Sequence, residues 1–138
     1  VAPSYKGNRV EIGIDYLDKV YGDKNIYSTP RDILKFDRAR NSPSFLEPAL
    51  LKQVYTGYSN EHPGRENYGL GIRMINWENG KNFYFHNGWW HGFTSSYIPL
   101  KDENVTIIAL SNKFTKSTYS VRKLAPLFGD YPFKVEDE

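Results

Sequence analysis

The middle of the chain contains the run Phe83-Tyr84-Phe85-His86-Asn87-Gly88-Trp89-Trp90-His91-Gly92-Phe93-Thr94-Ser95. Aromatic residues lead up to a histidine and then to Gly88, and a second glycine opens the next stretch. We therefore expect a strand that carries His86 to a bare backbone segment at the edge of a sheet. A basic side chain beside an open backbone N–H can hold a carbonyl oxygen and stabilise the negative charge that develops on it.

The residues around this run predict an antiparallel meander over residues 66–112. Asn79-Gly80 is a strong hairpin signal, because both central residues of a type I′ turn need a positive φ. Lys101-Asp102-Glu103-Asn104 is a second polar turn. The apolar run that follows it, Val105-Thr106-Ile107-Ile108-Ala109-Leu110, is typical of a strand that is covered on both faces. We expect four strands, at residues 68–77, 81–86, 92–100 and 105–110.

Two helices are expected before the meander, within residues 29–56. Thr29-Pro30-Arg31-Asp32 starts the first helix, because threonine caps helices, proline fits the first turn and aspartate there faces the positive end of the helix dipole. Asn41-Ser42-Pro43 ends it. Ser44-x-x-Glu47 predicts a capping box at the start of the second helix.

The two ends of the chain complete the predicted fold. Residues 1–22 are weakly patterned and fit an extended arm with one short strand. Residues 117–128 predict a closing helix that packs on the sheet through Val121, Leu124 and Phe128, with Pro126 kinking or ending it. The predicted class is α+β: an antiparallel sheet of four or more strands, with N-terminal helices and a C-terminal helix packed on it.

Composition excludes several classes of function. The 138 residues carry 18 basic and 16 acidic side chains, a formal net charge of +2. Nucleic-acid binding needs a concentrated basic surface, so no nucleic-acid partner is expected. The sequence has no cysteine, which excludes disulfides and thiolate chemistry. It also contains no apolar run of the roughly 20 residues that span a bilayer and no recognisable leader, so we expect neither a membrane span nor a signal peptide.

Histidines are the remaining candidates for a metal site. His62, His86 and His91 have no carboxylate or cysteine at ligand spacing around them. Gly69-x-Gly71 does not form a phosphate loop, because we place it inside a strand and no helix follows it. We therefore expect no metal and no cofactor.

Three segments share a pattern with one group of enzymes. They are Gly22-Asp23-Lys24-Asn25-Ile26-Tyr27-Ser28-Thr29-Pro30-Arg31-Asp32-Ile33, Tyr68-Gly69-Leu70-Gly71-Ile72, and His86-Asn87-Gly88 with the two strands after it. In this order they resemble the C-terminal part of the serine β-lactamase and penicillin-binding-protein superfamily. The most similar branch holds class C β-lactamases, D-Ala-D-Ala carboxypeptidases and related esterases. The resemblance implies that residues 1–138 form a single partial domain.

The resemblance assigns roles to the central motif. His86 takes the place of the lysine or histidine that orients the substrate and assists proton movement. Gly88 keeps the strand edge bare, and the backbone N–H of Trp89 matches one of the two oxyanion donors. Asn87 replaces a threonine, and its amide can bind a carboxylate or amide of the substrate. A histidine carries less positive charge than a lysine at neutral pH, which weakens any preference for substrates with a carboxylate.

The family's nucleophile is absent from the sequence. In this superfamily a Ser-x-x-Lys and a Tyr-x-Asn lie upstream of the part that resembles this chain. Ser120-Val121-Arg122-Lys123 and Tyr58-Ser59-Asn60 match these patterns, but at the wrong places in the order of elements. We interpret both as coincidental. The chain then carries half of an active site, and we expect it to be inactive alone.

Two functions remain open. The first is the C-terminal part of a serine acyl hydrolase that acts on a β-lactam, a D-amino-acid peptide or an ester, in the periplasm or cell envelope. The second is a non-catalytic module that binds a peptide or glycan through a Trp89-Trp90 loop, in which Trp90 contacts the ligand. The sequence leaves open whether the chain itself is an enzyme. A sheet lacking the strands that complete it in the family also predicts a homo-oligomer.

Overall fold

A computed structural model describes residues 1–20, 22, 26–60 and 64–133. Its main element is a five-stranded antiparallel sheet in which strands that follow one another along the chain are neighbours. The strands are β3 (Glu66–Tyr68), β4 (Arg73–Asn76), β5 (Asn82–Trp90), β6 (Phe93–Leu100) and β7 (Val105–Ser111). The predicted α+β class and the antiparallel sheet are confirmed.

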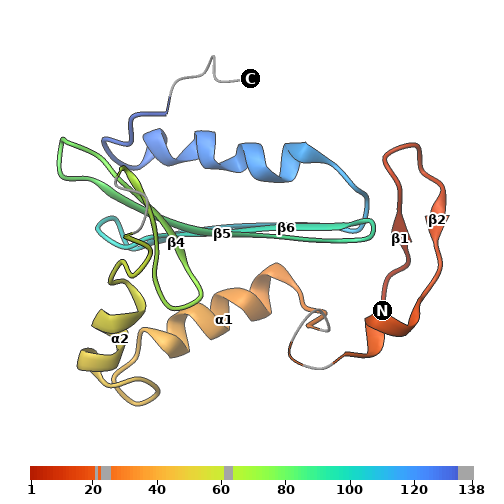
Figure 1. The fold of residues 1–138 in the computed structure, drawn as a ribbon, viewed down its shortest axis with the longest axis horizontal. Helices are drawn as coiled ribbons and strands as arrows, with labels where there is room; N and C mark the ends of the chain where they lie inside the picture. Colours follow the sequence, from red (N-terminus) through yellow and green to blue (C-terminus); the bar gives the residue numbers. More distant parts are fainter. Residues whose placement is uncertain (21, 23–25, 61–63, 134–138) are drawn as a thin grey trace.

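Helices cover the two faces of this sheet (Figure 1). On one side lie α1 (Pro30–Arg40) and α2 (Pro48–Val54), and on the other lies a 3-10 helix, η2 (Lys116–Leu127). None of the helices that the structure describes is long and apolar enough to cross a membrane.

The start of α1 follows the prediction, and the start of α2 does not. The Thr29 side chain accepts a hydrogen bond from the Asp32 N–H at 3.2 Å, and Pro30 is the first helical residue. In α2 the predicted capping box is wrong: Glu47 is the N-cap and its side chain makes no cap hydrogen bond. Pro48 begins that helix because its fixed φ suits the first turn and its missing N–H needs no partner there.

Glycines shape the turns of the meander differently from the prediction. The hairpin at Asn79-Gly80 exists, but Gly80 alone has a positive φ, of 84°. The Gly80 N–H donates to the Trp77 carbonyl at 3.0 Å, which indicates a type I turn followed by a left-handed glycine and not a type I′ turn. The strand predicted over residues 68–77 is in fact a hairpin, because Gly71 has a φ of 70° and the Gly69 N–H donates to the Ile72 carbonyl at 2.8 Å.

The core lies between the sheet and η2. Phe83, at its centre, is fully buried, and Ala125 of η2 is also fully buried. The predicted packing face of this helix is wrong in part, because Leu124 is 45% and Phe128 is 47% exposed. The buried members of that face are Thr118 and Ala125, and they lie on either side of the partly buried Val121.

Residues after η2 account for this difference. Tyr131 and Phe133 fold back onto Phe83, with ring centroids 5.9 and 4.7 Å from it. These two aromatic rings supply the apolar cover that we had expected from Phe128. Thr118 also turns inward to meet Thr94, with 3.0 Å between the two hydroxyl oxygens.

A buried polar network joins α1 to the face of the sheet that is opposite η2. Asp37 is 5% exposed and accepts hydrogen bonds from the Tyr97 hydroxyl and, at 2.8 Å, from the Thr106 hydroxyl. Arg40 donates to the hydroxyls of Tyr97 and Tyr55, both at 2.5 Å. Burial, followed by the hydrogen bond to Asp37, raises the pKa of Tyr97 above its ordinary range, so its hydroxyl stays a donor.

The first 20 residues form more than the predicted extended arm. They contain a two-stranded sheet of β1 (Ser4–Tyr5) and β2 (Glu11–Ile12), followed by a 3-10 helix, η1 (Tyr16–Lys19). This arm lies against the end of the main sheet (Figure 1), where the Tyr5 N–H donates to the Asn112 carbonyl at 2.8 Å. A Cβ atom at Gly92 would lie 2.3 Å from the Tyr5 carbonyl oxygen, so the β5–β6 turn needs a glycine there.

Strand β7 is at the edge of the described sheet, with β6 as its only strand partner there. Because an apolar edge with free N–H and C=O groups pairs readily with another chain, we expect the 138-residue protein to dimerise as its concentration rises. Light scattering after size-exclusion chromatography over a concentration series tests this. A single monomeric mass at every concentration would contradict it.

Candidate functional site

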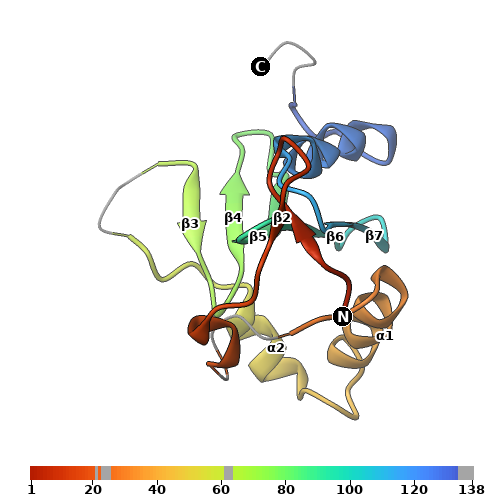
Figure 2. The same ribbon diagram turned by 90° about the vertical axis from the view of Figure 1, so that its right-hand side faces the viewer.

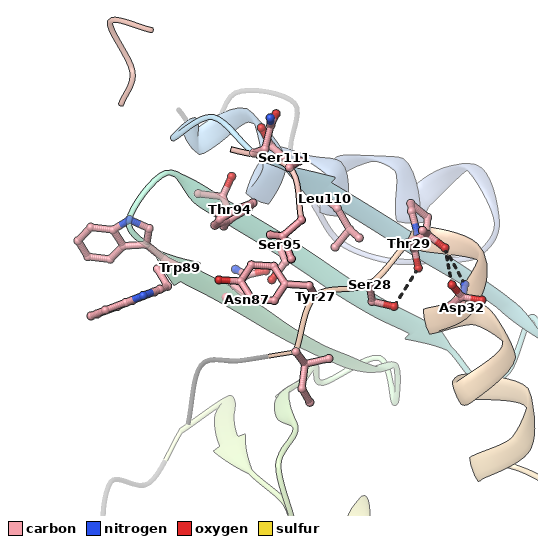
Figure 3. Close-up of a pocket in the computed structure, with 18 of the residues that line it drawn as sticks. Tyr27, Ser28, Thr29, Asp32, Asn87, Trp89, Thr94, Ser95, Leu110 and Ser111 are labelled. Atoms are coloured by element: carbon pink, nitrogen blue, oxygen red, sulfur yellow. Dashed lines mark hydrogen bonds between the residues drawn. The ribbon is translucent and has the colours of Figure 1, made fainter. Parts of the chain in front are cut away.

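A cavity of about 1180 Å³ lies between the segment that leads into α1 and the ends of the central strands (Figure 3). Figure 3 shows Tyr27, Ser28 and Thr29 running beside the strands that carry Asn87 and Ser95. The predicted motif residues and several that we did not predict meet here. The described lining includes Tyr27, Ser28, Thr29, His86, Asn87, Gly88, Trp89, Trp90, Phe93, Ser95 and Leu110.

One edge of β5 is open at this cavity. Strand β4 pairs with β5 only as far as Phe85, which lies opposite Arg73. Strand β6 pairs with the other side of β5 as far as Trp90. From His86 to Trp90, the outer edge of β5 therefore has no strand beside it among the residues that the structure describes.

The direction of the hydrogen bonds decides which N–H groups face this edge. In an antiparallel ladder, alternate residues of a strand bond to opposite sides. Trp90 and Phe93 close a two-residue turn, so Trp90, and with it Gly88 and His86, bond to β6. The N–H groups of Asn87 and Trp89 point to the open edge. The Trp89 N–H is thus free to meet an acceptor, and its role as an oxyanion donor stays a prediction.

Side chains of β5 alternate between the two faces of the sheet. His86 lies opposite Tyr97, on the face that α1 covers. Asn87 lies opposite Ser96, on the face of η2. The register therefore places the Asn87 side chain on the opposite face of the sheet from His86, while its backbone N–H faces the open edge, and the binding role of Asn87 stays a prediction.

The expected Trp89-Trp90 loop is wrong. Both tryptophans belong to β5, and the turn consists of His91 and Gly92. Successive strand residues face opposite sides, so the two indoles do not form one platform. Trp89 is 67% exposed, whereas the Trp90 indole N–H donates to Asp18 at 2.5 Å.

Gly88 fits closely against β6. A Cβ atom at this position would lie 2.4 Å from the Ser95 hydroxyl oxygen. Gly88 and Ser95 are direct partners in the ladder, so both occupy the face of His86. Sequence reasoning did not single out Ser95, because a serine in an alternating strand has no distinctive pattern.

The described part of the cavity carries little charge. His86 and Asp32 are the described lining residues with an imidazole or a carboxylate side chain, and no lysine or arginine is among the described lining residues. Asp32 already pairs with Lys35 at 2.9 Å and accepts a hydrogen bond from Thr29. No lysine or arginine side chain among the described lining residues is therefore placed to attract a carboxylate.

The other sequence candidates lie away from this site. Ser120 is exposed on η2, and Tyr58 is 52% exposed in the segment before β3. Neither is among the described residues that line the cavity. His62 lies outside the described residues.

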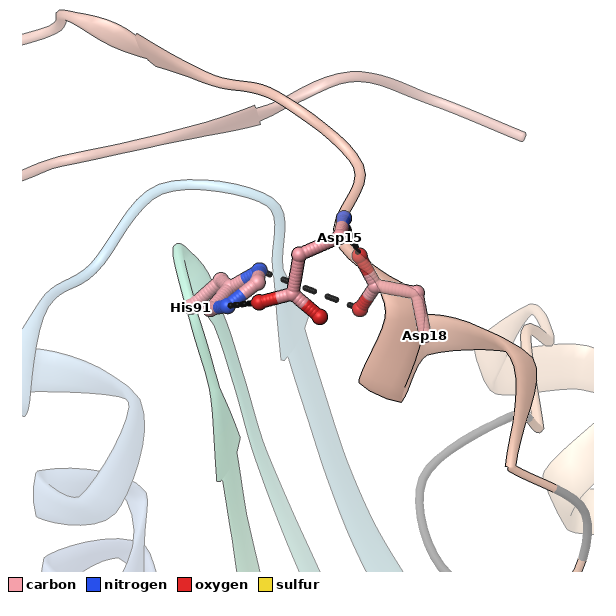
Figure 4. A group of neighbouring side chains, drawn as sticks. All are labelled: Asp15, Asp18 and His91. Atoms are coloured by element: carbon pink, nitrogen blue, oxygen red, sulfur yellow. Dashed lines mark hydrogen bonds and ion pairs between the residues drawn. The ribbon is translucent and has the colours of Figure 1, made fainter.

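His91 is clamped between two carboxylates of the N-terminal arm (Figure 4). Its Nε2 is 3.1 Å from Asp15, and its Nδ1 is 3.8 Å from Asp18. These three side chains lie close enough to hold a metal ion. However, each carboxylate faces a different ring nitrogen, and the Trp90 N–H already donates to Asp18, so both carboxylates already have partners within the protein.

We expect Asp18→Asn to destabilise the chain at neutral pH. The hydrogen bond from the Asp15 N–H, followed by that from Trp90, holds the pKa of Asp18 below its ordinary value of 3.8. A carboxyl with a lowered pKa stabilises the fold above its ordinary pKa, and this contribution is lost as the pH falls through the folded-state pKa. The variant should therefore melt below the wild type at pH 7, and the difference should shrink in acid.

Thermal unfolding, followed by circular dichroism at pH 7 and at an acidic pH, measures this difference in melting temperature. Asp130→Asn is the matched control, because Asp130 is exposed and its side chain has no described hydrogen bond. Equal melting temperatures of wild type and Asp18→Asn at pH 7 would show that the clamp does not stabilise the arm.

The sequence pattern of the β-lactamase family matches residues 2–126. The chain belongs to the β-lactamase family. Among curated proteins, this β-lactamase-family chain is 29% identical over 126 residues to "Penicillin-binding protein 4*" of Bacillus subtilis (strain 168). That match covers 88% of the chain and 28% of the relative. The superfamily inferred from the motifs is confirmed.

Solved structures share the fold of this β-lactamase-family chain. A penicillin-binding protein from Bacillus halodurans matches 71% of the chain with a TM-score of 0.62 and 15% identity. A D-stereospecific amidohydrolase from Streptomyces sp. matches 70% of it with a TM-score of 0.51 and 23% identity. The chain spans 30% and 29% of those two structures, so it corresponds to less than a third of each.

Proposed function

We propose that this chain forms the substrate-binding wall of a serine acyl hydrolase that acts on a β-lactam, a D-amino-acid peptide or an ester. The open edge of β5 carries this proposal, because it places the Trp89 N–H beside His86 and the side-chain-free Gly88. Membership of the β-lactamase family supports it. In this proposal the serine, lysine and tyrosine of the reaction belong to a part of the enzyme other than residues 1–138.

The chemistry that we assign to the open edge of β5 is the stabilisation of a tetrahedral intermediate. A serine hydroxyl from the rest of the enzyme adds to the substrate carbonyl, and its proton passes to the base supplied with it. The carbonyl oxygen becomes an oxyanion and accepts a hydrogen bond from the Trp89 N–H. When the carbonyl reforms, the leaving group takes a proton and departs, and water later releases the acyl group. His86 orients the substrate during these steps.

The names of the relatives bear on substrate and location. The Bacillus subtilis relative is named a penicillin-binding protein, and one fold neighbour is a D-stereospecific amidohydrolase. These names favour an acyl substrate that contains an amide or a β-lactam. They also favour the cell envelope as the location of the complete enzyme.

We expect the 138-residue chain alone to be chemically inert, because no described hydrogen bond joins a serine of the cavity lining to a side-chain base: the Ser28 and Ser111 hydroxyls donate to backbone carbonyls. It should hydrolyse neither nitrocefin nor p-nitrophenyl acetate above background. It should also resist covalent labelling by a fluorophosphonate or by penicillin, as measured by intact-protein mass spectrometry. Labelling that maps to Ser120 would overturn both the interpretation of that motif and the proposed division of the active site.

Exposure of Trp89 supports the alternative of a non-catalytic module that binds a peptide or glycan. The complete reading frame of the gene distinguishes the two functions. A Ser-x-x-Lys followed by a Tyr-x-Asn favours the hydrolase, and their absence favours the binding module.

A further inference from the structure

Tyr68 belongs to one of the three segments that resemble the family, but the sequence did not predict that its side chain contacts His86. Its hydroxyl oxygen is 3.0 Å from His86 Nε2, and the two rings meet edge to face with centroids 6.0 Å apart. Tyr68 pairs with Arg73 at the end of β3, and Arg73 pairs with Phe85 of β5. The Tyr68 side chain therefore reaches across the end of β4, to the first residue of β5 that β4 leaves uncovered.

The backbone holds Tyr68 in this position. The next residue is Gly69, where a Cβ atom would lie 2.1 Å from the Val54 carbonyl oxygen. The Tyr68 carbonyl also accepts a hydrogen bond from the Tyr58 N–H at 2.9 Å. The hydroxyl thus meets the imidazole from a fixed direction.

The hydrogen-bond partners of His86 and Tyr68 indicate which ring nitrogen of a neutral His86 carries the proton. A neutral imidazole has one donor and one acceptor nitrogen, and a phenol has one O–H donor. Among the described residues, the Tyr68 hydroxyl has no other acceptor, and His86 Nδ1 has no partner. If Nε2 carried the proton, the half-buried Tyr68 O–H would have no acceptor in this part of the chain. If Tyr68 donates to Nε2, the Tyr68 hydroxyl has an acceptor and Nε2 has a donor, and the ring proton lies on Nδ1.

We propose that Tyr68 is a positioning residue that holds neutral His86 as its Nδ1–H tautomer. His86 then meets a bound molecule as a hydrogen-bond donor and not as a proton acceptor. The matching group on the substrate is an oxygen acceptor, such as the carbonyl of an amide, ester or β-lactam. This last step rests on the proposed function, whereas the tautomer is a property of the chain itself.

Long-range 1H–15N correlation spectra of the 15N-labelled 138-residue chain test the tautomer directly. The spectra are recorded as the pH is raised, and the tautomer is determined where the shifts of the ring nitrogens stop changing, which identifies the neutral imidazole. For the wild type we expect His86 Nδ1 to show the shift of a protonated nitrogen and Nε2 that of an unprotonated one. Tyr68→Phe should change this pattern to a mixture of tautomers with a substantial Nε2–H population.

Tyr58→Phe is the matched control, because it removes a hydroxyl from an exposed tyrosine of the preceding segment. It should leave the His86 signals unchanged. A wild-type spectrum of the Nε2–H tautomer would overturn the proposal, and so would a Tyr68→Phe spectrum identical to that of the wild type. If Tyr68→Phe does not fold, the wild-type spectrum alone decides.

The measurement involves no nucleophile, so its outcome is independent of catalysis. An Nδ1–H tautomer in a protein whose complete form hydrolyses no acyl substrate would refute the proposed function and leave the role of Tyr68 intact. An Nε2–H tautomer in an active enzyme would refute the role of Tyr68 alone.

Discussion

His86→Ala is expected to lower the acylation rate of the complete hydrolase about 100- to 1000-fold. The loss of one contact made to the developing charge in the transition state typically costs about 2.7–4 kcal/mol. His86 lies on the cavity face of β5, one residue beyond the last pairing with β4, so its removal leaves that part of the open edge without a polar side chain. Stopped-flow measurement of acylation with a chromogenic substrate gives the rate.

Two further variants test the assignment around His86. His86→Lys should retain more activity than His86→Ala and shift preference toward substrates with a carboxylate, because it adds a permanent charge to a cavity whose described lining has no lysine or arginine. Trp89→Ala should affect substrate binding more than acylation, since the donor is the backbone N–H. Each variant needs an unchanged melting temperature. An acylation rate of His86→Ala equal to that of the wild type would show that His86 has only a structural role.

Asp37→Ala is expected to have the largest effect on stability, about 3–5 kcal/mol in the free energy of unfolding. Asp37 and Arg40 have side chains only 8% and 12% exposed, so removing the carboxylate leaves a buried guanidinium without its counter-charge. The hydroxyls of Tyr97 and Thr106 lose their acceptor at the same time. Urea denaturation of the 138-residue chain, followed by far-ultraviolet circular dichroism, measures the change.

Two comparisons separate the buried charge from the helix itself. Lys35→Ala removes an exposed ion-pair partner from the same helix and should change stability by about 0.5 kcal/mol or less. Asp37→Ala combined with Arg40→Met should be more stable than Asp37→Ala alone, because no unpaired charge remains. A loss below about 1 kcal/mol in Asp37→Ala would show that the network does not anchor α1.

Local signals in the sequence predicted the elements whose cause is local. Thr29 and Pro30 start α1 because their effects act within one turn of the helix. The motif at His86 lies on a strand, as predicted, because the aromatic residues around it favour a strand through their own packing. The β-lactamase family could be inferred from the sequence for the same reason, since its motifs are short and occur in a fixed order.

Contacts between distant residues explain what the sequence did not predict. Gly69 and Gly71 looked like strand residues, yet the backbone of α2 approaches this segment so closely that it turns. Tyr131 and Phe133 displaced Phe128 from the core only because the end of the chain folds back. Likewise, Tyr68 meets His86 across a strand that separates them in the sheet, and no sequence spacing records such a contact.

The open edge of β5 has a consequence for self-association. The N–H groups of Asn87 and Trp89 lie about 7 Å apart on one side of the strand, which is the repeat of any extended chain. A neighbouring molecule that added its β7 there would occupy the groups assigned to the acyl substrate, so dimer and ligand would exclude one another. A dimer formed through two β7 edges would leave those groups free. The mode of association therefore determines whether the site stays accessible when the protein is concentrated.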